Sequence, residues 1–360
     1  MNKKRVAVLF GGVSSEHEVS CMSAASVLRN IPEENYDVLR VGIDKSGDWF
    51  LYSGPIEAIA DAGWAKHPEN RPAFIAPGLS PKGLTVRSGD SYEQLPLDAV
   101  FPVLHGKNGE DGTMQGLLQL AGLPFVGCDA TSSAACMDKV LTNVMLDAMD
   151  IPQAKYVWFY DYEYQKDPDA ALRRVEEALG RYPVFVKPAN AGSSVGVSKA
   201  TDAASLKRAI EIAVREDSKI LIEEGIDGQE VECAVFGGKE PVASIVGEIA
   251  PSNEFYDYEA KYISGSSGLY IPARIEEPVS NRIRETAVRA FQAMGCFGLA
   301  RVDFFVRRGT GEVLLNELNT LPGFTSISMY PKLMEASGLA YPELIDRLIA
   351  LAIRRAEESK

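Results

Sequence analysis

The stretch RVDFFVRRGTGEVLLNELN, Arg301 to Asn319, carries the most informative pattern in the chain. Two strand-like runs flank a glycine-bounded turn that centres near Thr310. A hairpin about that centre places Asp303 opposite Glu317 and Arg301 opposite Asn319, and side chains two residues apart share a face. One face of the hairpin is therefore predicted to carry two carboxylates, an amide and a guanidinium.

This group of side chains is suited to metal and phosphate chemistry. Hard oxygen ligands such as Asp303, Glu317 and Asn319 favour magnesium, which commonly combines a few carboxylates with substrate phosphates. Arg301 beside them could neutralise charge that develops on a reacting acyl or phosphoryl group. Spacing alone leaves an exposed hairpin face with a salt bridge as an equal alternative.

Bulk properties exclude several classes of protein. The 360 residues are 46% hydrophobic, which predicts two or three globular domains. A formal charge of -13 disfavours broad attraction to nucleic acid or to an anionic membrane. No run approaches the roughly 20 apolar residues of a membrane-spanning helix. Scattered cysteines without a CxxC pair favour reduced thiols and a cytoplasmic protein: Cys21, Cys128, Cys136, Cys233 and Cys296.

Strand-like and helical runs alternate along the chain, which is typical of α/β architecture. The first region predicts strands over residues 5–10, 36–43 and 99–104 and a helix over 16–28, with Ser15 and Glu18 as a capping box. A doubly wound parallel sheet fits this region, with ligands at the carboxyl ends of its strands. GGVSSE lacks the spacing of a dinucleotide fingerprint.

The remaining regions continue the alternation. The middle region predicts strands over 156–159, 184–187 and 219–223 and a helix over 203–215. The last region predicts strands over 231–236, 242–249, 300–306 and 313–318 and helices over 280–294 and 342–355. The polar, aromatic stretch 250–272 has little periodicity and is predicted to be a loop.

Two lysines could complete a nucleotide site. Lys187 ends the apolar run YPVFVKP, and NAGSSVG follows at once, offering backbone N–H groups and the hydroxyls of Ser193 and Ser194 to phosphates. Lys139 in CMDKVLTN could reach a phosphate or lie on an exposed helix face. No GxxxxGK[ST] segment is present, so a P-loop is excluded.

The ordered motifs MDK, VFVKPANAGSSVG, LIEEGIDGQE, EFYDYEAKY, GLARVDFF and LLNELNTLPGFTSISMYP resemble those of ATP-grasp enzymes, specifically D-alanine:D-alanine ligases. GGVSSEHEVS and LHGKNGEDGTMQGLLQLAGLPFVG match the same family, so the resemblance covers nearly the whole chain. It implies an N-terminal substrate-binding α/β domain over 1–127, a central ATP-grasp subdomain over 128–222, and a C-terminal catalytic domain over 223–360 with a mobile loop over 250–272. Residues 45–96 are the least diagnostic part.

The resemblance also implies a nucleotide site between the second and third domains. Lys139, Lys187 and Ser194 would bind phosphates, Glu223 and Ile226 would lie against adenine, and Glu230 would bind the ribose. Gly225 stands where the family often carries a tryptophan. The cofactors implied are ATP and two Mg2+ or Mn2+ ions, held by Asp303, Glu317 and Asn319.

Amino-acid sites are implied between the first and third domains. Glu16 would pair with the ammonium group of the first D-alanine, with His105 nearby, and would share hydrogen bonds with Ser193 and Tyr262. The residues implied to hold the second D-alanine are Lys261, Ser328 and Met329. Arg301 and the backbone N–H of Gly323 would stabilise the oxyanion. From the residues alone, the default interpretation of Glu16 is a helix-start carboxylate and that of His105 is a hydrogen-bonded structural histidine.

The activity implied is ATP-dependent ligation of two D-alanine molecules through a D-alanyl phosphate, releasing ADP and phosphate, for peptidoglycan precursors. A homodimer is the expected assembly. One alternative is a D-alanine:D-lactate or other ATP-grasp ligase, against which YEAKY argues. Another is a non-catalytic nucleotide-binding regulator, which would be expected to lose a metal ligand or Arg301.

Overall fold

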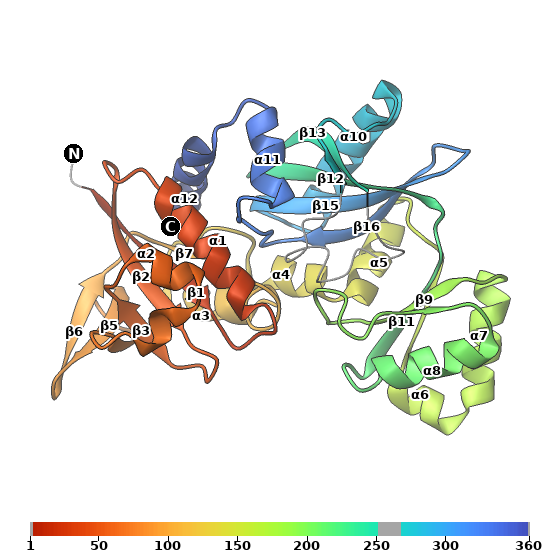
Figure 1. The fold of residues 1–360 in the computed structure, drawn as a ribbon, viewed down its shortest axis with the longest axis horizontal. Coiled ribbons are helices and arrows are strands. Elements are labelled where there is room, and N and C mark those ends of the chain that lie inside the picture. Colours follow the sequence, from red (N-terminus) through yellow and green to blue (C-terminus); the bar gives the residue numbers. More distant parts are fainter. Residues whose placement is uncertain (1–2, 251–267, 359–360) are drawn as a thin grey trace.

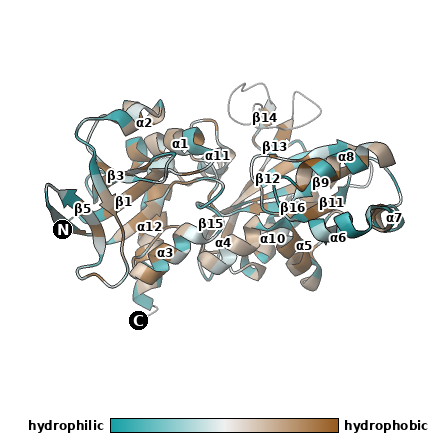
Figure 2. Ribbon diagram, turned by 90° about the horizontal axis from the view of Figure 1, so that it is seen from below, coloured by the Kyte–Doolittle hydropathy of each residue, from teal (hydrophilic) through white to brown (hydrophobic). Residues whose placement is uncertain are grey.

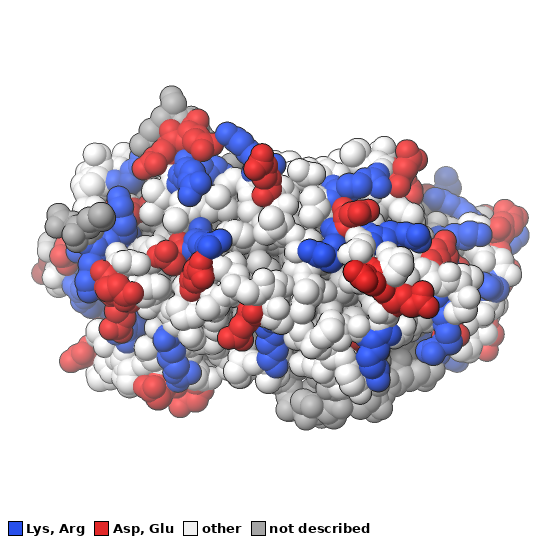
Figure 3. All heavy atoms as spheres, turned by 90° about the horizontal axis from the view of Figure 1, so that it is seen from above, with Lys and Arg blue, Asp and Glu red and all other residues white. Residues whose placement is uncertain are grey.

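The computed structural model describes residues 3–250 and 268–358, and these residues form three β-sheets with flanking helices (Figure 1). The strand orders are β6-β5-β4-β3-β2-β1-β7, β10-β9-β11-β8 and β14-β13-β12-β15-β16. No helix in the described ranges is long and apolar enough to cross a membrane. Acidic and basic side chains are interspersed over the face in Figure 3.

The seven-stranded sheet has a parallel part and an antiparallel part. β1 (Lys4–Gly11) pairs in parallel with β2 (Tyr36–Ile43) and β7 (Ala99–Pro102), which confirms the predicted strands. Residues 45–96, the part of the chain with the least diagnostic sequence, extend the sheet with antiparallel strands: β3 (Trp49–Tyr52), β4 (Arg71–Phe74), β5 (Gly83–Ser88) and β6 (Ser91–Pro96). The predicted parallel sheet is therefore only one end of the sheet, the strands β2-β1-β7.

Both faces of the parallel part are buried, which explains the continuous apolar run of β1. Val6, Val8 and Phe10 face a core that includes α1 (His17–Asn30) and α12 (Tyr341–Glu358). Ala7 and Leu9 face another core, which α3 (Thr113–Ala121) covers. Figure 2 shows the hydrophobic residues along β1, and in Figure 1 α12 lies beside α1. The last helix therefore packs on the first domain.

The start of α1 differs from the predicted capping box. Glu16 is its N-cap residue and makes no side-chain capping bond, and Glu18 instead pairs with Lys45 at 2.5 Å. Two short elements, α2 (Ile56–Ala60) and the 3-10 helix η1 (Gly63–Lys66), complete this domain. Glu16 is thereby left to face the pocket described below.

The four-stranded sheet is antiparallel. It contains β8 (Tyr156–Tyr160), β9 (Val184–Pro188), β10 (Ser198–Ala200) and β11 (Lys219–Glu224). The helices of its main core are α6 (Asp161–Lys166), α7 (Pro168–Leu179) and α8 (Ala203–Ala213). On a second, smaller core, Val140 of α5 (Lys139–Ala148) meets Ala189 and Leu221.

The five-stranded sheet contains β12 (Gly228–Gly237), β13 (Val242–Ala250), β14 (Gly268–Tyr270), β15 (Gly298–Arg307) and β16 (Val313–Asn319). One core joins it to α4 (Ala130–Met137), α5 and α10 (Glu277–Ala293), and another joins it to α11 (Met329–Ala336) and α12. β14 pairs with β13, so residues 268–270 of the predicted loop form a strand instead. Lys261 and Tyr262 lie outside the described residues.

Candidate functional site

The hairpin of β15 and β16 has the predicted pairing at its polar end. Asp303 lies opposite Glu317, and Arg301 lies opposite Asn319. Nearer the turn, however, the register differs by one residue, because Val306 pairs with Val313 and the ladder shifts between Asp303 and Phe304. Asn316 is the additional residue of this β-bulge, and bulges re-aim side chains near functional sites. Both Asn316 and Glu317 line the pocket.

A row of three carboxylates crosses the sheet. Glu232 of β12 lies opposite Asp303 of β15, which lies opposite Glu317 of β16. Glu232 and Asp303 are buried, with 5% and 9% of their surface exposed. Like charges on directly opposed residues are unfavourable, so the row requires positive charge beside it.

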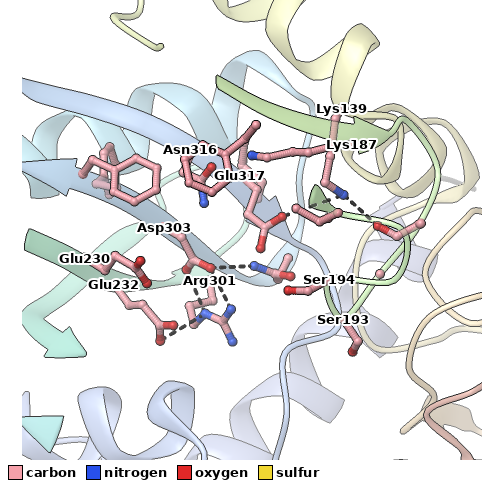
Figure 4. A pocket seen from close by; sticks show the side chains of 18 of the residues that line it. Lys139, Lys187, Ser193, Ser194, Glu230, Glu232, Arg301, Asp303, Asn316 and Glu317 are labelled. Carbon is pink, nitrogen blue, oxygen red and sulfur yellow. Dashed lines mark hydrogen bonds and ion pairs between the residues drawn. The ribbon is translucent and has the colours of Figure 1, made fainter. Parts of the chain in front are cut away.

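Arg301 supplies part of that charge. Its Nε and Nη2 atoms donate to the two carboxylate oxygens of Asp303 at 2.8 and 2.7 Å, and its Nε lies 3.1 Å from Glu232 Oε2 (Figure 4). Asn319 also donates to Asp303, at 3.0 Å. Arg301 therefore bridges two members of the carboxylate row.

Two lysines from other elements face the same space. Lys139, at the start of α5, donates to the backbone oxygen of Ala191 at 2.8 Å and lies 3.9 Å from Glu317. Lys187 of β9 pairs with Glu223 of β11 at 2.5 Å. Burial acts to lower the pKa of Lys187, but its neighbouring carboxylates, Glu223 first, raise the pKa above its ordinary value. Lys187 therefore keeps its positive charge at neutral pH.

These residues line one cavity of about 830 Å³, a size suited to a small-molecule site. Fourteen of the sequence-predicted site residues line it: Glu16, His105, Lys139, Lys187, Ser193, Ser194, Glu223, Ile226, Glu230, Arg301, Asp303, Glu317, Asn319 and Gly323. All three sheet regions contribute. Figure 4 labels ten of the lining residues, and eight of these ten belong to the fourteen.

Two predicted residues lie behind the cavity wall. Ser328 precedes α11, and its Oγ accepts a hydrogen bond from the N–H of Thr325 at 3.0 Å. It lies close to Gly323, where an added Cβ would come within 2.7 Å of Ser328 Oγ. Met329 is 5% exposed and belongs to a hydrophobic core. Ser328 thus packs against a wall residue, and Met329 contributes to the packing beneath it.

The glycine-rich segment after β9 reaches Glu16 across the cavity. Ser193 Oγ donates to Glu16 Oε1 at 2.5 Å. Ser193 and Ser194 have φ angles of 50° and 60°, and consecutive left-handed non-glycine residues store strain of a kind that concentrates at ligand sites. The segment is therefore held in a conformation that local preference does not favour.

His105 is tied to protein groups on both ring nitrogens. Nδ1 lies 3.0 Å from the backbone oxygen of Leu321, and Nε2 lies 3.0 Å from Ser23 Oγ. Burial lowers the pKa of His105, against the opposing influence of the Glu16 carboxylate. The neutral ring therefore donates from Nδ1 to Leu321 and accepts from Ser23. Ser23 Oγ in turn accepts from the N–H of Phe324 at 3.2 Å.

Sequence reasoning missed four acidic residues of the wall, Glu110, Glu224, Asp227 and Glu232. Glu232 had a detectable signal, because Glu230 and Glu232 are two apart in an otherwise apolar strand and so share a face. Glu110 had none, since it stands in the polar segment GKNGEDG. Its carboxylate accepts from the N–H of Gly106 at 2.8 Å, and desolvation followed by the charge of Glu16 raises its pKa to about 8.

The donor set fits a hard divalent cation. Asp303, Glu317 and Asn319 supply carboxylate and amide oxygens on one face, which is the chemistry magnesium prefers. Across the described ranges no three His, Cys, Asp or Glu side chains already converge as ligands. Arg301 and Lys139 lie against the two carboxylates of this set, so cations already occupy the region where a metal would compensate charge.

Comparisons with known proteins agree with this geometry. Family models described as D-ala D-ala ligase N-terminus and C-terminus match residues 5–128 and 145–350. D-alanine–D-alanine ligases of Acetivibrio thermocellus and Ruminiclostridium cellulolyticum are 51% and 50% identical, covering 99% and 100% of this chain and 98% of each relative.

Two solved structures are similar over almost their whole length. The VanG D-Ala:D-Ser ligase from Enterococcus faecalis is 43% identical, with a TM-score of 0.89 over 98% of this chain and 100% of that one. The D-alanine-D-alanine ligase from Coxiella burnetii is 36% identical, with a TM-score of 0.88 over 100% and 96%. The carboxylate row, the facing lysines and these full-length similarities place the chain in the D-alanine–D-alanine ligase family.

Proposed function

We propose that this enzyme joins two D-alanine molecules at the expense of ATP, through a D-alanyl phosphate, and releases ADP and phosphate. The observation that supports it best is the meeting of three kinds of group in one cavity. The carboxylate row with Arg301, the lysines Lys139 and Lys187, and the pair Glu16–Ser193 all line it. The cavity therefore combines a region suited to metal and phosphate with a carboxylate suited to the ammonium group of an amino acid.

The first step activates a carboxylate, because direct attack by an amine would have to expel oxide. A carboxylate oxygen of the first D-alanine attacks the γ-phosphorus of ATP, and the bond to ADP breaks. Lys139, Lys187 and Ser194 would hold the phosphates, with Glu223 and Ile226 at adenine and Glu230 at ribose. Two Mg2+ or Mn2+ ions on Asp303, Glu317 and Asn319 would neutralise phosphate charge.

Glu16 would bind the ammonium group of the first D-alanine. Glu16 is 5% exposed, and its carboxylate already accepts a hydrogen bond from Ser193, so an amino acid here would meet an oriented, poorly hydrated charge. Tyr262 is proposed to join this hydrogen-bonded set. His105 supports the neighbouring Leu321 through its backbone oxygen. Pairing with Glu16 would fix the carboxylate of the substrate toward the phosphate region.

The second step forms the peptide bond. The amine of the second D-alanine, after losing a proton, attacks the acyl carbon, and the C–O bond to phosphate then breaks. Arg301 and the backbone N–H of Gly323 would stabilise the oxyanion, and losing one such donor typically costs about 3–4 kcal/mol. Lys261, Ser328 and Met329 are proposed to determine the second site. The dipeptide would supply peptidoglycan synthesis, and the enzyme would act as a homodimer.

The identity of the second substrate is the finer question, since one similar solved structure is a D-Ala:D-Ser ligase. We expect ADP release to require D-alanine and to fail with L-alanine. Parallel reactions that offer D-serine or D-lactate beside D-alanine, with products identified by mass, would reveal a different acceptor. A predominance of either mixed product would overturn the proposed acceptor. If D-alanine did not stimulate ADP release, the alternative of a non-catalytic nucleotide-binding regulator would be favoured.

A further inference from the structure

Arg301 contacts two carboxylates, Asp303 and Glu232, and only Asp303 is a proposed metal ligand. It makes a two-pronged contact with Asp303, and its Nε lies 3.1 Å from Glu232. In the strand order β12-β15-β16, Asp303 is the middle residue, with Glu232 on one side and Glu317 on the other. Asp303 therefore has neighbouring carboxylates in both directions.

The two proposed tasks of Asp303 and Arg301 conflict in this arrangement. Both oxygens of Asp303 accept hydrogen bonds from Arg301, and one of them also accepts from Asn319. These three bonds use three of the roughly four lone-pair positions of the carboxylate, and a divalent cation between Asp303 and Glu317 would compete with Arg301 for the same two oxygens. Repulsion between the guanidinium and a divalent cation on one carboxylate favours release of Asp303 by Arg301, and release also frees Nη2 for the oxyanion.

We propose that Glu232 is the positioning residue that retains Arg301 when the metal takes Asp303. This inference rests on the proposed function, because it assumes a metal at Asp303 and Glu317. The guanidinium moves from a bridge between Asp303 and Glu232 to a contact centred on Glu232. Its Nη2 atom is then released from Asp303 and can face the reacting acyl group.

Burial and placement both support this role. Glu232 is 5% exposed and Arg301 has a side-chain exposure of 15%, so each needs an ionic partner in every state of the site. The Nε–H of Arg301 points at Asp303 Oδ1 at 2.8 Å, while Glu232 Oε2 lies only 3.1 Å from the same nitrogen. A small rotation transfers the hydrogen bond. Glu232 also lies on the strand away from Glu317, so Arg301 would not occupy the metal side.

A purely structural Glu232 would behave differently from a positioning residue. In Glu232→Gln, Arg301 retains Asp303 as its ionic partner and competes harder with the metal. We expect Mn2+ to bind about tenfold more weakly in the presence of an ATP analogue that cannot transfer its γ-phosphate, as the loss of one charge-assisted contact implies. Protein-bound Mn2+ is measured directly from water-proton relaxation, without turnover.

Glu248→Gln is the matched control. Glu248 is a 3% exposed carboxylate on the neighbouring strand β13, and its ionic partner is Arg274 rather than Arg301. Its loss should lower stability by removing a buried charge but leave Mn2+ binding unchanged. An equal weakening of Mn2+ binding in both variants would show a general effect of buried charge and would overturn the proposal.

A double-mutant cycle separates action through Arg301 from direct attraction between Glu232 and the metal. In an Arg301→Met background, Glu232→Gln should no longer weaken Mn2+ binding, because the competing guanidinium is absent. The same tenfold weakening in both backgrounds, or no weakening in either, would overturn the positioning role. Dipeptide formation by the unchanged enzyme is measured on the same preparation. If no dipeptide forms, the proposed function fails. The Mn2+-binding cycle reports on Glu232 in either case.

Discussion

Glu317 and Asp303 face each other across the hairpin but have different surroundings. Asp303 is enclosed by Arg301, Asn319 and Glu232, whereas Glu317 has a side-chain exposure of 27% and lies 3.9 Å from Lys139. A change at Glu317 should therefore disturb function more than folding. Residue type and spacing left a metal role for Glu317 and an exposed, salt-bridged face as equal alternatives, and the family resemblance favoured the metal. Lys139 was singled out as a phosphate ligand, so its contact with Glu317 was not predicted.

Replacing Glu317 with Gln removes one charge and retains the shape. Changes to residues outside the ligand shell typically cost about 10- to 100-fold in metal affinity or activity, so a ligand change should lower turnover by at least about tenfold. Its unfolding free energy should change by about 0.5 kcal/mol or less. Glu312→Gln, in the turn of the same hairpin, is the control and should leave turnover unchanged. Near-normal turnover of Glu317→Gln at low magnesium would remove the metal role.

Glu110 gives the site a pH-dependent stability. Desolvation and the charge of Glu16 raise its folded pKa to about 8 from an ordinary 4.5, so the folded protein binds this proton more tightly than the unfolded chain does. The stabilising contribution is full below about pH 4.5 and is lost as the pH rises toward 8. The Gln side chain of Glu110→Gln stays neutral, so this variant does not lose that contribution. The unfolding free energy of the variant minus that of the unchanged protein should therefore increase from pH 5 to pH 8. The unfolding free energies of both proteins are measured by denaturation at each pH. A constant difference between them across this range would contradict the raised pKa.

At the scale of elements, the alternation of apolar and polar residues predicted most strands well. The hairpin shows the limit of such a pattern. A turn centred near Thr310 predicted the correct facing pairs, yet the ladder beside the turn pairs Val306 with Val313 and the bulge at Asn316 restores Asp303 to Glu317. Nothing in the sequence NEL distinguishes a bulged strand from a regular one, because a bulge depends on the partner strand. For the same reason the short strand β14 was not predicted within its polar stretch.

Helix α5 begins at Lys139, and its capping residue positions that lysine. Asp138 Oδ1 accepts from the N–H groups of Val140 and Leu141 at 3.0 and 3.1 Å, while Oδ2 pairs with Lys219 at 2.5 Å. Asp138→Asn keeps the cap and loses the charge, whereas Asp138→Ala loses both. Unfolding free energies should therefore fall in the order Asp, Asn, Ala, with about 1 kcal/mol for the cap alone. Equal stabilities of the Asn and Ala variants, measured by urea denaturation, would remove the capping contribution.

For the whole molecule, the motifs indicated ATP-grasp architecture but could not show how its parts meet. The proposed division at residues 127 and 222 stays a prediction. The structure adds that α12 packs on the first domain and that α5 contributes to cores of two sheets. Such long-range packing leaves no local periodicity in a sequence, since any apolar helix face can cover any apolar sheet face.

A chain of hydrogen bonds links the first domain to the segment that carries Gly323. The N–H of Phe324 donates to Ser23 Oγ, Ser23 donates to His105, and His105 donates to Leu321. Ser23→Ala leaves two buried polar groups without this partner and should lower the unfolding free energy by about 1–3 kcal/mol. We expect turnover to fall as well, because the displaced segment holds the proposed oxyanion donor.

Ser133→Ala is the matched control for Ser23→Ala. Ser133 is equally buried, at 0% exposure, but its hydroxyl has no hydrogen-bond partner among the described residues. Its replacement should be neutral or stabilising in thermal or urea unfolding. If both variants lost the same free energy, the loss would reflect a missing buried atom rather than the hydrogen-bond chain.

In the proposed mechanism, a D-alanine carboxylate is activated by phosphoryl transfer before the peptide bond forms. D-Alanine labelled with ¹⁸O in both carboxylate oxygens tests it directly, because the oxygen that attacks the γ-phosphorus leaves with phosphate when the amine attacks. We expect one ¹⁸O atom in each phosphate that is released with a dipeptide, measured by mass spectrometry. Dipeptide formation with unlabelled phosphate would contradict it.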